Sequence, residues 1–194
     1  MAQRKAPRCP KKAREEGRLI CYADECSISM MPNLSHTFAP RGQRPVIVTS
    51  TEVSVRVYVA SAISSRGDLV WDTQNRPFTS ADIINFLKKV YRSLRQPIMV
   101  IWDNASIHSS EQVRNFLKEA DQESLHLIQQ PKYSPHLNAD EQVWSYLKRV
   151  ELANNCKKNI KELLPQIEKG LNNMARKPQL IRQFFKHPEP GFYN

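Results

Sequence analysis

Three acidic residues, far apart in the chain, have positions that could form one metal site. Asp24 follows the apolar run Leu19–Ala23, and Asp103 directly follows the apolar run Ile98–Trp102. Glu141 lies at the start of a segment whose apolar residues recur at helical spacing. Carboxylates from two strand ends and one helix can hold Mg²⁺ against a phosphodiester. The sequence therefore predicts an enzyme that acts on nucleic acid.

Each acid on a strand also has an ordinary structural explanation. Asp103 and Asn104 both favour turns, so the pair could simply end a strand. Asp24 and Glu25 face opposite sides of a strand, so only one of them can enter a site. Taken singly, these alternatives stay open. They weaken together, because three independent accidents would have to place acids around one core.

The third acid has a competitor beside it. Asn138 and Glu141 have the spacing of a capping box, in which the Glu side chain folds back on the N–H of the cap residue. Asp140 suits the positive end of a helix dipole. Relative to Val143 and Trp144, Asp140 points more nearly inward than Glu141 does. Spacing alone leaves the choice between Asp140 and Glu141 open.

The hydropathy pattern predicts the strands that must position these acids. Alternating valines indicate a half-buried antiparallel strand, and Gly67 starts a hairpin turn. A strand that is apolar on both faces, such as Ile98–Trp102, belongs inside a covered sheet and often has a parallel partner. The expected antiparallel meander consists of Arg18–Met30, Glu52–Ile63 and Leu69–Trp71.

Helices are expected to alternate with the later strands. Ser80 is predicted to cap the first long helix. In the helix opened by Asn138, Leu147 and Val150 are predicted to face inward. Three strands followed by alternating helices and strands indicate a mixed α/β fold. The remaining predicted elements are Glu111–Ala120, Leu125–Ile128, a helix opened by Asn159, and Leu180–Phe185.

Charge indicates the kind of partner. The net charge is +10 and the pI is near 9.6, which suits a polyanion, since each phosphate contact by Lys or Arg releases a counterion. Residues 1–18 contain seven Lys or Arg against two Glu. This composition predicts a flexible basic arm over residues 1–17 and a folded domain over 18–194.

The four cysteines show no metal-binding spacing, so we expect reduced thiols in an intracellular protein. The longest apolar runs are about five residues, against roughly 20 for a membrane helix. No apolar stretch of signal-peptide type follows the basic start. We therefore expect a cytoplasmic protein with no membrane partner.

Four segments match the motifs of a known family in the same order. Asp103–His108 reads D-N-A-S-I-H, and Tyr133–Trp144 reads Y-S-P-H-L-N-A-D-E-Q-V-W. Tyr22–Glu25 is similar to the strand of the family's first acid, and Phe38–Pro45 to the turn after it. These segments resemble DDE transposases of the bacterial insertion-sequence branch of the mariner-type superfamily. The resemblance covers about residues 18–150.

The resemblance implies a ribonuclease H-like fold, with three antiparallel strands, then parallel strands, and helices on both faces. It also implies a catalytic triad of Asp24, Asp103 and Glu141, which selects Glu141 over Asp140. Two Mg²⁺ or Mn²⁺ ions are expected, with Asp24 bridging them. They would activate water or a DNA 3′-OH and stabilise the leaving oxygen, without a covalent protein–DNA intermediate.

The activity implied is metal-dependent cleavage and strand transfer at transposon ends, that is, cut-and-paste DNA transposition. The alternatives are another nuclease of this fold, such as a junction resolvase, or a catalytically inactive transposase-derived DNA-binding protein. Candidates for supporting the ligands or touching phosphates are Glu25, Asn104, His108 and Asp140. Candidates for binding double-stranded DNA are Lys11, Lys12, Arg14, Arg18, Arg41, Lys132, Lys148 and Arg149.

The sequence also departs from the family pattern. Ala139-Asp140 replaces Pro-Ile, and Phe38 replaces a Trp. Thirty-seven residues separate Asp103 from Glu141, which predicts a loop insertion near Asp121–Ser124. Relatives in this family carry N-terminal helix-turn-helix domains, whereas only the basic arm precedes the expected folded domain in this sequence. The resemblance therefore predicts a catalytic module, which pairs as a homodimer on DNA or works with a separate DNA-reading chain. The expected location is the nucleoid of a bacterium or archaeon.

Overall fold

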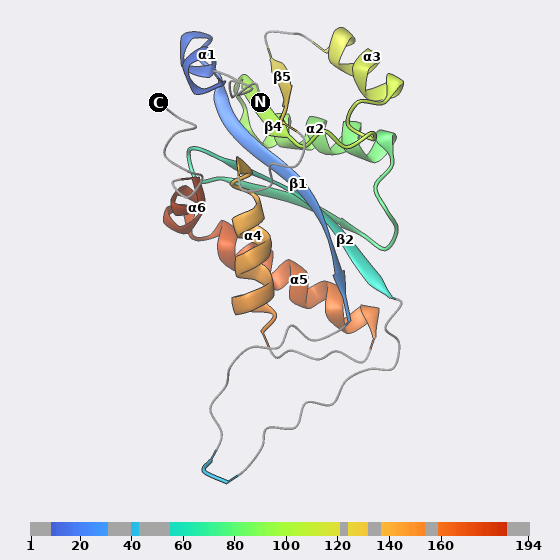
Figure 1. The fold of residues 1–194 in the computed structure, drawn as a ribbon, viewed down its shortest axis with the longest axis vertical. Coiled ribbons are helices and arrows are strands. Elements are labelled where there is room, and N and C mark those ends of the chain that lie inside the picture. Colours follow the sequence, from blue (N-terminus) through green and yellow to red (C-terminus); the bar gives the residue numbers. More distant parts are fainter. Residues whose placement is uncertain are drawn as a thin grey trace, which may run out of the picture.

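The computed structural model describes residues 9–30, 40–42, 55–120, 124–131, 137–153 and 159–185 (Figure 1). A five-stranded sheet with the order β3-β2-β1-β4-β5 forms its centre. The first three strands pair antiparallel, and β4 pairs parallel to both β1 and β5. This confirms the predicted mixed sheet. The strands are β1 (Leu19–Ser29), β2 (Arg56–Ser64), β3 (Leu69–Gln74), β4 (Ile98–Trp102) and β5 (Leu125–Gln129).

Helices cover both faces of the sheet, as predicted. Those of one face, α2 and α3, share an apolar core with the sheet that is separate from the core under α4, α5 and α6. Figure 1 shows α4 and α5 beside the long strand β1. None of the described helices is long and apolar enough to cross a membrane. The helices are α1 (Cys9–Glu15), α2 (Ser80–Leu94), α3 (Glu111–Glu119), α4 (Glu141–Tyr146), the π-helical turn η2 (Leu147–Glu151), α5 (Ile160–Ala175) and α6 (Pro178–Phe185).

The apolar strand β4 is buried along its whole length, because it contributes to both cores. Met99 and Ile101 pack in the core under α4–α6, whereas Val100 and Trp102 pack under α2 and α3. The strand beside it, β1, alternates in the same way and continues past the end of β4. The carboxyl end of β4 therefore lies next to the middle of β1, at the kind of position where ligands bind in such sheets.

The start of the chain corrects one prediction. Within the arm that was expected to be flexible, residues 9–15 form the helix α1. Ala13 is buried, and its carbonyl accepts a 2.8 Å hydrogen bond from the N–H of Arg18. The composition of the arm did not predict this helix, because a single small apolar residue is enough to pack one short helix against β1. Residues 1–8 lie outside the described residues.

Helix boundaries give two further corrections. The cap of α2 is Thr79, one residue before Ser80, and it forms a capping box with Asp82. Val150 was predicted to face inward, yet it is 55% exposed. It lies in the π-helical turn η2, whose wider turn shifts the helical phase after Leu147.

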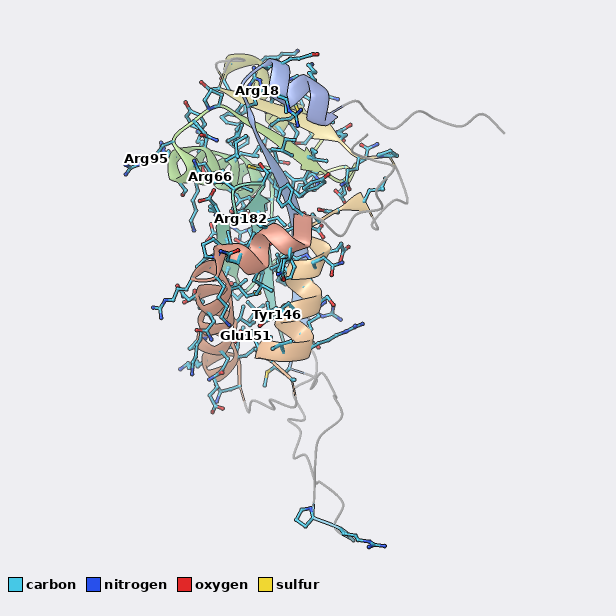
Figure 2. All side chains as sticks on the ribbon, turned by 90° about the vertical axis from the view of Figure 1, so that its left-hand side faces the viewer. Arg18, Arg66, Arg95, Tyr146, Glu151 and Arg182 are labelled. Atoms are coloured by element: carbon cyan, nitrogen blue, oxygen red, sulfur yellow. The ribbon has the colours of Figure 1, made fainter. Side chains whose placement is uncertain are left out.

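The hairpin between β2 and β3 makes a close contact with α6. Gly67 has φ +99, and a Cβ atom on it would lie 2.5 Å from the backbone oxygen of Pro178. The side chain of Arg182 donates a 2.8 Å hydrogen bond to the carbonyl of Arg66. Figure 2 shows these two arginines as neighbours where the hairpin meets α6. Glycine is therefore needed at position 67 for both conformation and space.

Replacing Gly67 with Ala should lower the free energy of unfolding by about 3 kcal/mol, since backbone strain and an overlap with backbone atoms add together. Gly17 is a matched control, because it has φ +63 but nothing within 4 Å of the added Cβ. Gly17→Ala should cost only about 1 kcal/mol. Urea unfolding measures both, and equal losses would contradict the close contact.

Candidate active site

Strand register brings the first two acids to the same level of the sheet. Tyr22 of β1 pairs with Ile101 of β4 in a parallel ladder. The paired ladder ends there, and continuing its register by two residues would set Asp24 beside Asp103. Because adjacent strands lie about 4.8 Å apart, the two acids follow the ends of the ladder on neighbouring strands.

Asp24 lies on the face of β1 that α4 covers. Its carboxylate accepts hydrogen bonds from the Trp144 indole N–H (3.1 Å) and the Glu25 backbone N–H (2.9 Å). Burial, followed by the nearby charge of Glu141, raises its pKa to about 7. Asp24 on β1 and Glu141 on α4 are therefore close enough to repel each other.

Glu141 is not part of a capping box. The helix α4 begins at Glu141, three residues later than predicted, and Asp140 occupies the cap position without a side-chain cap bond. The side chain of Asn138 instead donates to the carbonyl of Ala23 (3.1 Å) and accepts from the Asp140 N–H (3.1 Å). Within the described part of the chain, the exposed Glu141 carboxylate has no hydrogen bond, so it is available to a ligand.

Asp140 is fully buried beside the same strands. The Ser61 hydroxyl donates a 2.6 Å hydrogen bond to its Oδ2, while Oδ1 has no partner among the described residues. Ser61 pairs with Asp24 across β1 and β2. Burial, and next the charge of Asp24, raises the pKa of Asp140 well above its usual value. The neutral form of Asp140 is therefore favoured in the fold.

The second acid, Asp103, has a different environment. Its Oδ1 lies 2.7 Å from Nδ1 of His108, and the other ring nitrogen, Nε2, lies 2.8 Å from Oε1 of Glu25. The hydrogen bond from His108 lowers the pKa of Asp103. Burial alone would lower the pKa of His108, but the bonds to Asp103 and Glu25 outweigh it and raise this pKa to about 9. At neutral pH, Asp103 is therefore ionised.

Asp24 and Glu25 face opposite sides of the sheet, as predicted. Glu25 accepts a 3.1 Å bond from the Trp102 indole N–H on the α2 side, whereas Asp24 bonds Trp144 on the α4 side. Of these two acids, Asp24 is therefore the one that shares a face of the sheet with α4 and Glu141.

The acids fit a divalent cation in chemistry. Asp24, Asp103 and Glu141 offer hard carboxylate oxygens, and a cation would relieve the repulsion that raises the pKa of Asp24. Across the described ranges, no three His, Cys, Asp or Glu side chains already surround one point closely enough to hold an ion. Glu141 is exposed, so its side chain can change rotamer without disturbing either core.

One predicted DNA contact lies near these acids. The ammonium of Lys148 lies against the thiol of Cys26, on the same face of β1 as Asp24, and the charges of Asp24 and Glu141 also reach this thiol. Burial is the largest cause that raises the pKa of Cys26. The next residue, Arg149, is exposed. Lys148 could therefore contact a phosphate next to the acids.

The other predicted DNA contacts are scattered. Lys12 and Arg14 lie on α1, which is at the N-terminal end of β1 in Figure 1. Arg18 bonds Glu16 at 2.6 Å and its side chain is only 10% exposed, which favours an internal ion pair over a phosphate contact. Arg41 is exposed, as is Asn104. Lys132, Phe38, the predicted insertion at 121–123 and the side chain of Lys11 lie outside the described residues.

Three residues of the site were missed by sequence reasoning. Trp144 and Trp102 were read as core residues only, and Ser61 was not considered. The two indole N–H groups are the donors to Asp24 and Glu25. Spacing gave one usable signal, since Trp144 lies one helical turn after Glu141 and so shares its face. Nothing in the sequence pairs Ser61 with Asp140.

Comparison with known proteins identifies the family of the chain. Residues 19–164 match the family described as DDE superfamily endonuclease. The insertion element IS630 uncharacterized 39 kDa protein of Shigella sonnei is 28% identical over 161 residues. This match covers 82% of the chain and 46% of the relative, so the chain spans about half the length of this curated relative.

Solved structures share the fold. The mariner Mos1 paired end complex with Mg has a TM-score of 0.65 at 15% identity, over 91% of this chain and 56% of that chain. The catalytic domain of Mos1 mariner transposase has a TM-score of 0.54 at 12% identity, over 89% and 86%. At such identities the likeness shows the fold alone. The fold is ribonuclease H-like, as the sequence resemblance implied.

Replacing Asp140 with Asn should stabilise the chelator-treated protein at pH 8 but not at pH 4. The folded-state pKa is raised, so wild type loses stability as pH rises above about 4, by up to about 1.4 kcal/mol per pH unit. The amide avoids this loss and still accepts from Ser61. Thermal melting at both pH values measures the effect.

Asp82 is a control for which the pH dependence of stability should have the opposite sign. Its hydrogen bond with Arg76 is the largest of the causes that lower its pKa, so the stability it contributes is present at pH 8 and is lost as pH falls. Asp82→Asn should therefore destabilise the protein at pH 8. A gain for Asp140→Asn that is the same at pH 4 and pH 8 would contradict the buried neutral acid.

Proposed function

Because the chain belongs to the DDE superfamily of endonucleases, we propose that it catalyses metal-dependent DNA strand cleavage and strand transfer at transposon ends. The relative with a curated description comes from an insertion element, and the Mos1 structures include complexes with a transposon end, with Mg and with Mn. Double-stranded DNA and Mg²⁺ or Mn²⁺ are the proposed substrate and cofactor.

One observation carries the proposal. Asp24 on β1 lies within reach of the charge of Glu141 on α4, at the level of the sheet where β4 ends in Asp103. These are the three acids that the motif resemblance selects. Carboxylates on two neighbouring strands and on the helix that covers one of them suit phosphodiester chemistry, in which charge stabilisation supplies most of the rate enhancement.

In this proposal Asp24, Asp103 and Glu141 hold the divalent ions. The ions supply activation of the water or 3′-OH nucleophile and stabilisation of the leaving oxygen. Asp24 is oriented by the Trp144 indole N–H and the Glu25 backbone N–H. Asn138 fixes the start of α4 to β1 through the Ala23 carbonyl, which sets the distance between Glu141 and Asp24. Lys148 contacts the DNA backbone beside the acids.

Glu141→Gln should reduce nicking of supercoiled plasmid in Mn²⁺ at least 100-fold, because the amide is a poor metal ligand. Asp140→Asn is the matched control and should stay within about tenfold of wild type, since Asp140 is buried, its Oδ2 is bonded to Ser61 and its raised pKa disfavours the ionised form that binds a metal. Gel analysis of nicked circles measures both, and circular dichroism checks folding.

The reverse pattern would make Asp140 the third ligand and place the motif out of register. If both variants keep their nicking activity, α4 does not contribute a metal ligand to the site. A preference for four-way junctions over linear duplex would favour a resolvase over a transposase.

Lys148→Ala should weaken binding of duplex DNA and reduce the slope of log affinity against log salt by about 0.9, the value for one phosphate contact. Lys161→Ala on α5 is the control, as this exposed lysine has no link to the acids. Fluorescence anisotropy across a salt series measures both slopes. Equal slopes for wild type and Lys148→Ala would exclude a phosphate contact at Lys148.

A further inference from the structure

We propose that Glu25 and His108 are positioning residues for Asp103: they fix one oxygen of its carboxylate and leave the other oxygen for a metal ion. This inference rests on the proposed function, in which Asp103 is a metal ligand. Glu25, on the side of the sheet away from Asp24, would thereby act on the site through another residue.

The contacts form a continuous chain from β1 to the end of β4. Glu25 Oε1 lies 2.8 Å from His108 Nε2, and His108 Nδ1 lies 2.7 Å from Asp103 Oδ1. The same Nδ1 also lies 3.2 Å from the backbone carbonyl oxygen of Asp103, so His108 contacts both the side chain and the main chain of this residue. The backbone N–H of Ala105 donates a second bond, of 3.1 Å, to the same Oδ1. Among the described residues, Oδ2 of Asp103 has no partner. One oxygen is thus anchored twice, and the other is available.

The side chain of His108 is buried and packs against Trp102. Its ring centroid lies 4.3 Å from that of Trp102, and its side chain is only 1% exposed. The Trp102 indole N–H donates a 3.1 Å bond to Oε2 of Glu25, so Trp102, Glu25 and His108 form a closed ring of contacts. The turn after β4 is fixed by the bond from the His108 N–H to the Ala105 carbonyl (3.1 Å).

This arrangement is suited to orienting a ligand. A carboxylate at a strand end that is 51% exposed would otherwise sample several rotamers. Hydrogen bonds from outer residues that orient a metal ligand are typically worth about 10- to 100-fold in metal affinity or activity. Because His108 faces a carboxylate oxygen at both nitrogens, its two bonds can be removed separately.

Two substitutions separate those bonds. His108→Asn places an amide N–H near the Nδ1 position and keeps a donor for Asp103. His108→Gln places it near the Nε2 position and keeps a donor for Glu25 only. Isothermal titration with Mn²⁺ in the absence of DNA should show affinity about tenfold weaker for His108→Gln and within about threefold of wild type for His108→Asn.

Two further variants complete the test. Glu25→Gln should weaken Mn²⁺ binding by an intermediate factor, since the amide still accepts from Trp102 or His108 but lacks the charge. Asp103→Asn should weaken binding more than any of these. Melting curves in chelator check that each variant folds, so that affinities are compared among folded proteins.

The outcomes separate the two proposals. If Asp103→Asn weakens Mn²⁺ binding but the Asn and Gln variants at His108 bind equally, the positioning role is wrong and the metal site stands. If Asp103→Asn binds as wild type does, or wild type binds no Mn²⁺, the metal role of Asp103 and the positioning inference both fail. A larger loss for His108→Asn than for His108→Gln would also overturn the inference.

Discussion

Repulsion between carboxylates at a partly buried position is the constraint around which this site is built. Asp24 lies where β1 loses its partner β4, so its side chain is close to solvent yet still largely covered by α4. Burial and the charge of Glu141 both disfavour its ionised form, while N–H groups of Trp144 and Glu25 offset part of that cost. The two apolar cores on either face of the sheet provide the stability that tolerates this arrangement.

The alternation of side chains along β1 divides the site into two halves. On the α4 face, Asp24 lies near Glu141 and the buried Asp140, and Lys148 lies beside Cys26. On the α2 face, Glu25 pairs with His108 and Trp102. Asp103 belongs to this second half through His108, which lowers its pKa. The ionised form of Asp103 is therefore favoured by its neighbours, whereas a cation would be needed to offset the burial and repulsion at Asp24.

The sequence predicted the parts of the structure that depend on burial pattern. The alternating β2, the hairpin at Gly67 and the fully apolar β4 all appear in the fold, because these patterns report which face of an element is covered. It failed where the outcome depends on a partner that is distant in sequence. Asn138 was expected to cap its own helix, but its side-chain N–H donates to the carbonyl of Ala23 on β1, which ties the side chain to the sheet. Likewise, Val150 is exposed because a π-helical turn shifts the phase, which an ideal helical period cannot anticipate.

The choice between Asp140 and Glu141 shows how structure adds what spacing cannot. Helical phase favoured Asp140 as the inward acid, and Asp140 is indeed the buried one. That burial argues against it as a ligand, because its Oδ2 is bonded to Ser61 and its ionised form is strongly disfavoured. Glu141 is exposed and its charge acts on Asp24, so its carboxylate is available to an ion that enters from solvent. The acid that points inward, Asp140, is thus the less available to a metal ion, and a metal ligand must have a carboxylate that the ion can reach.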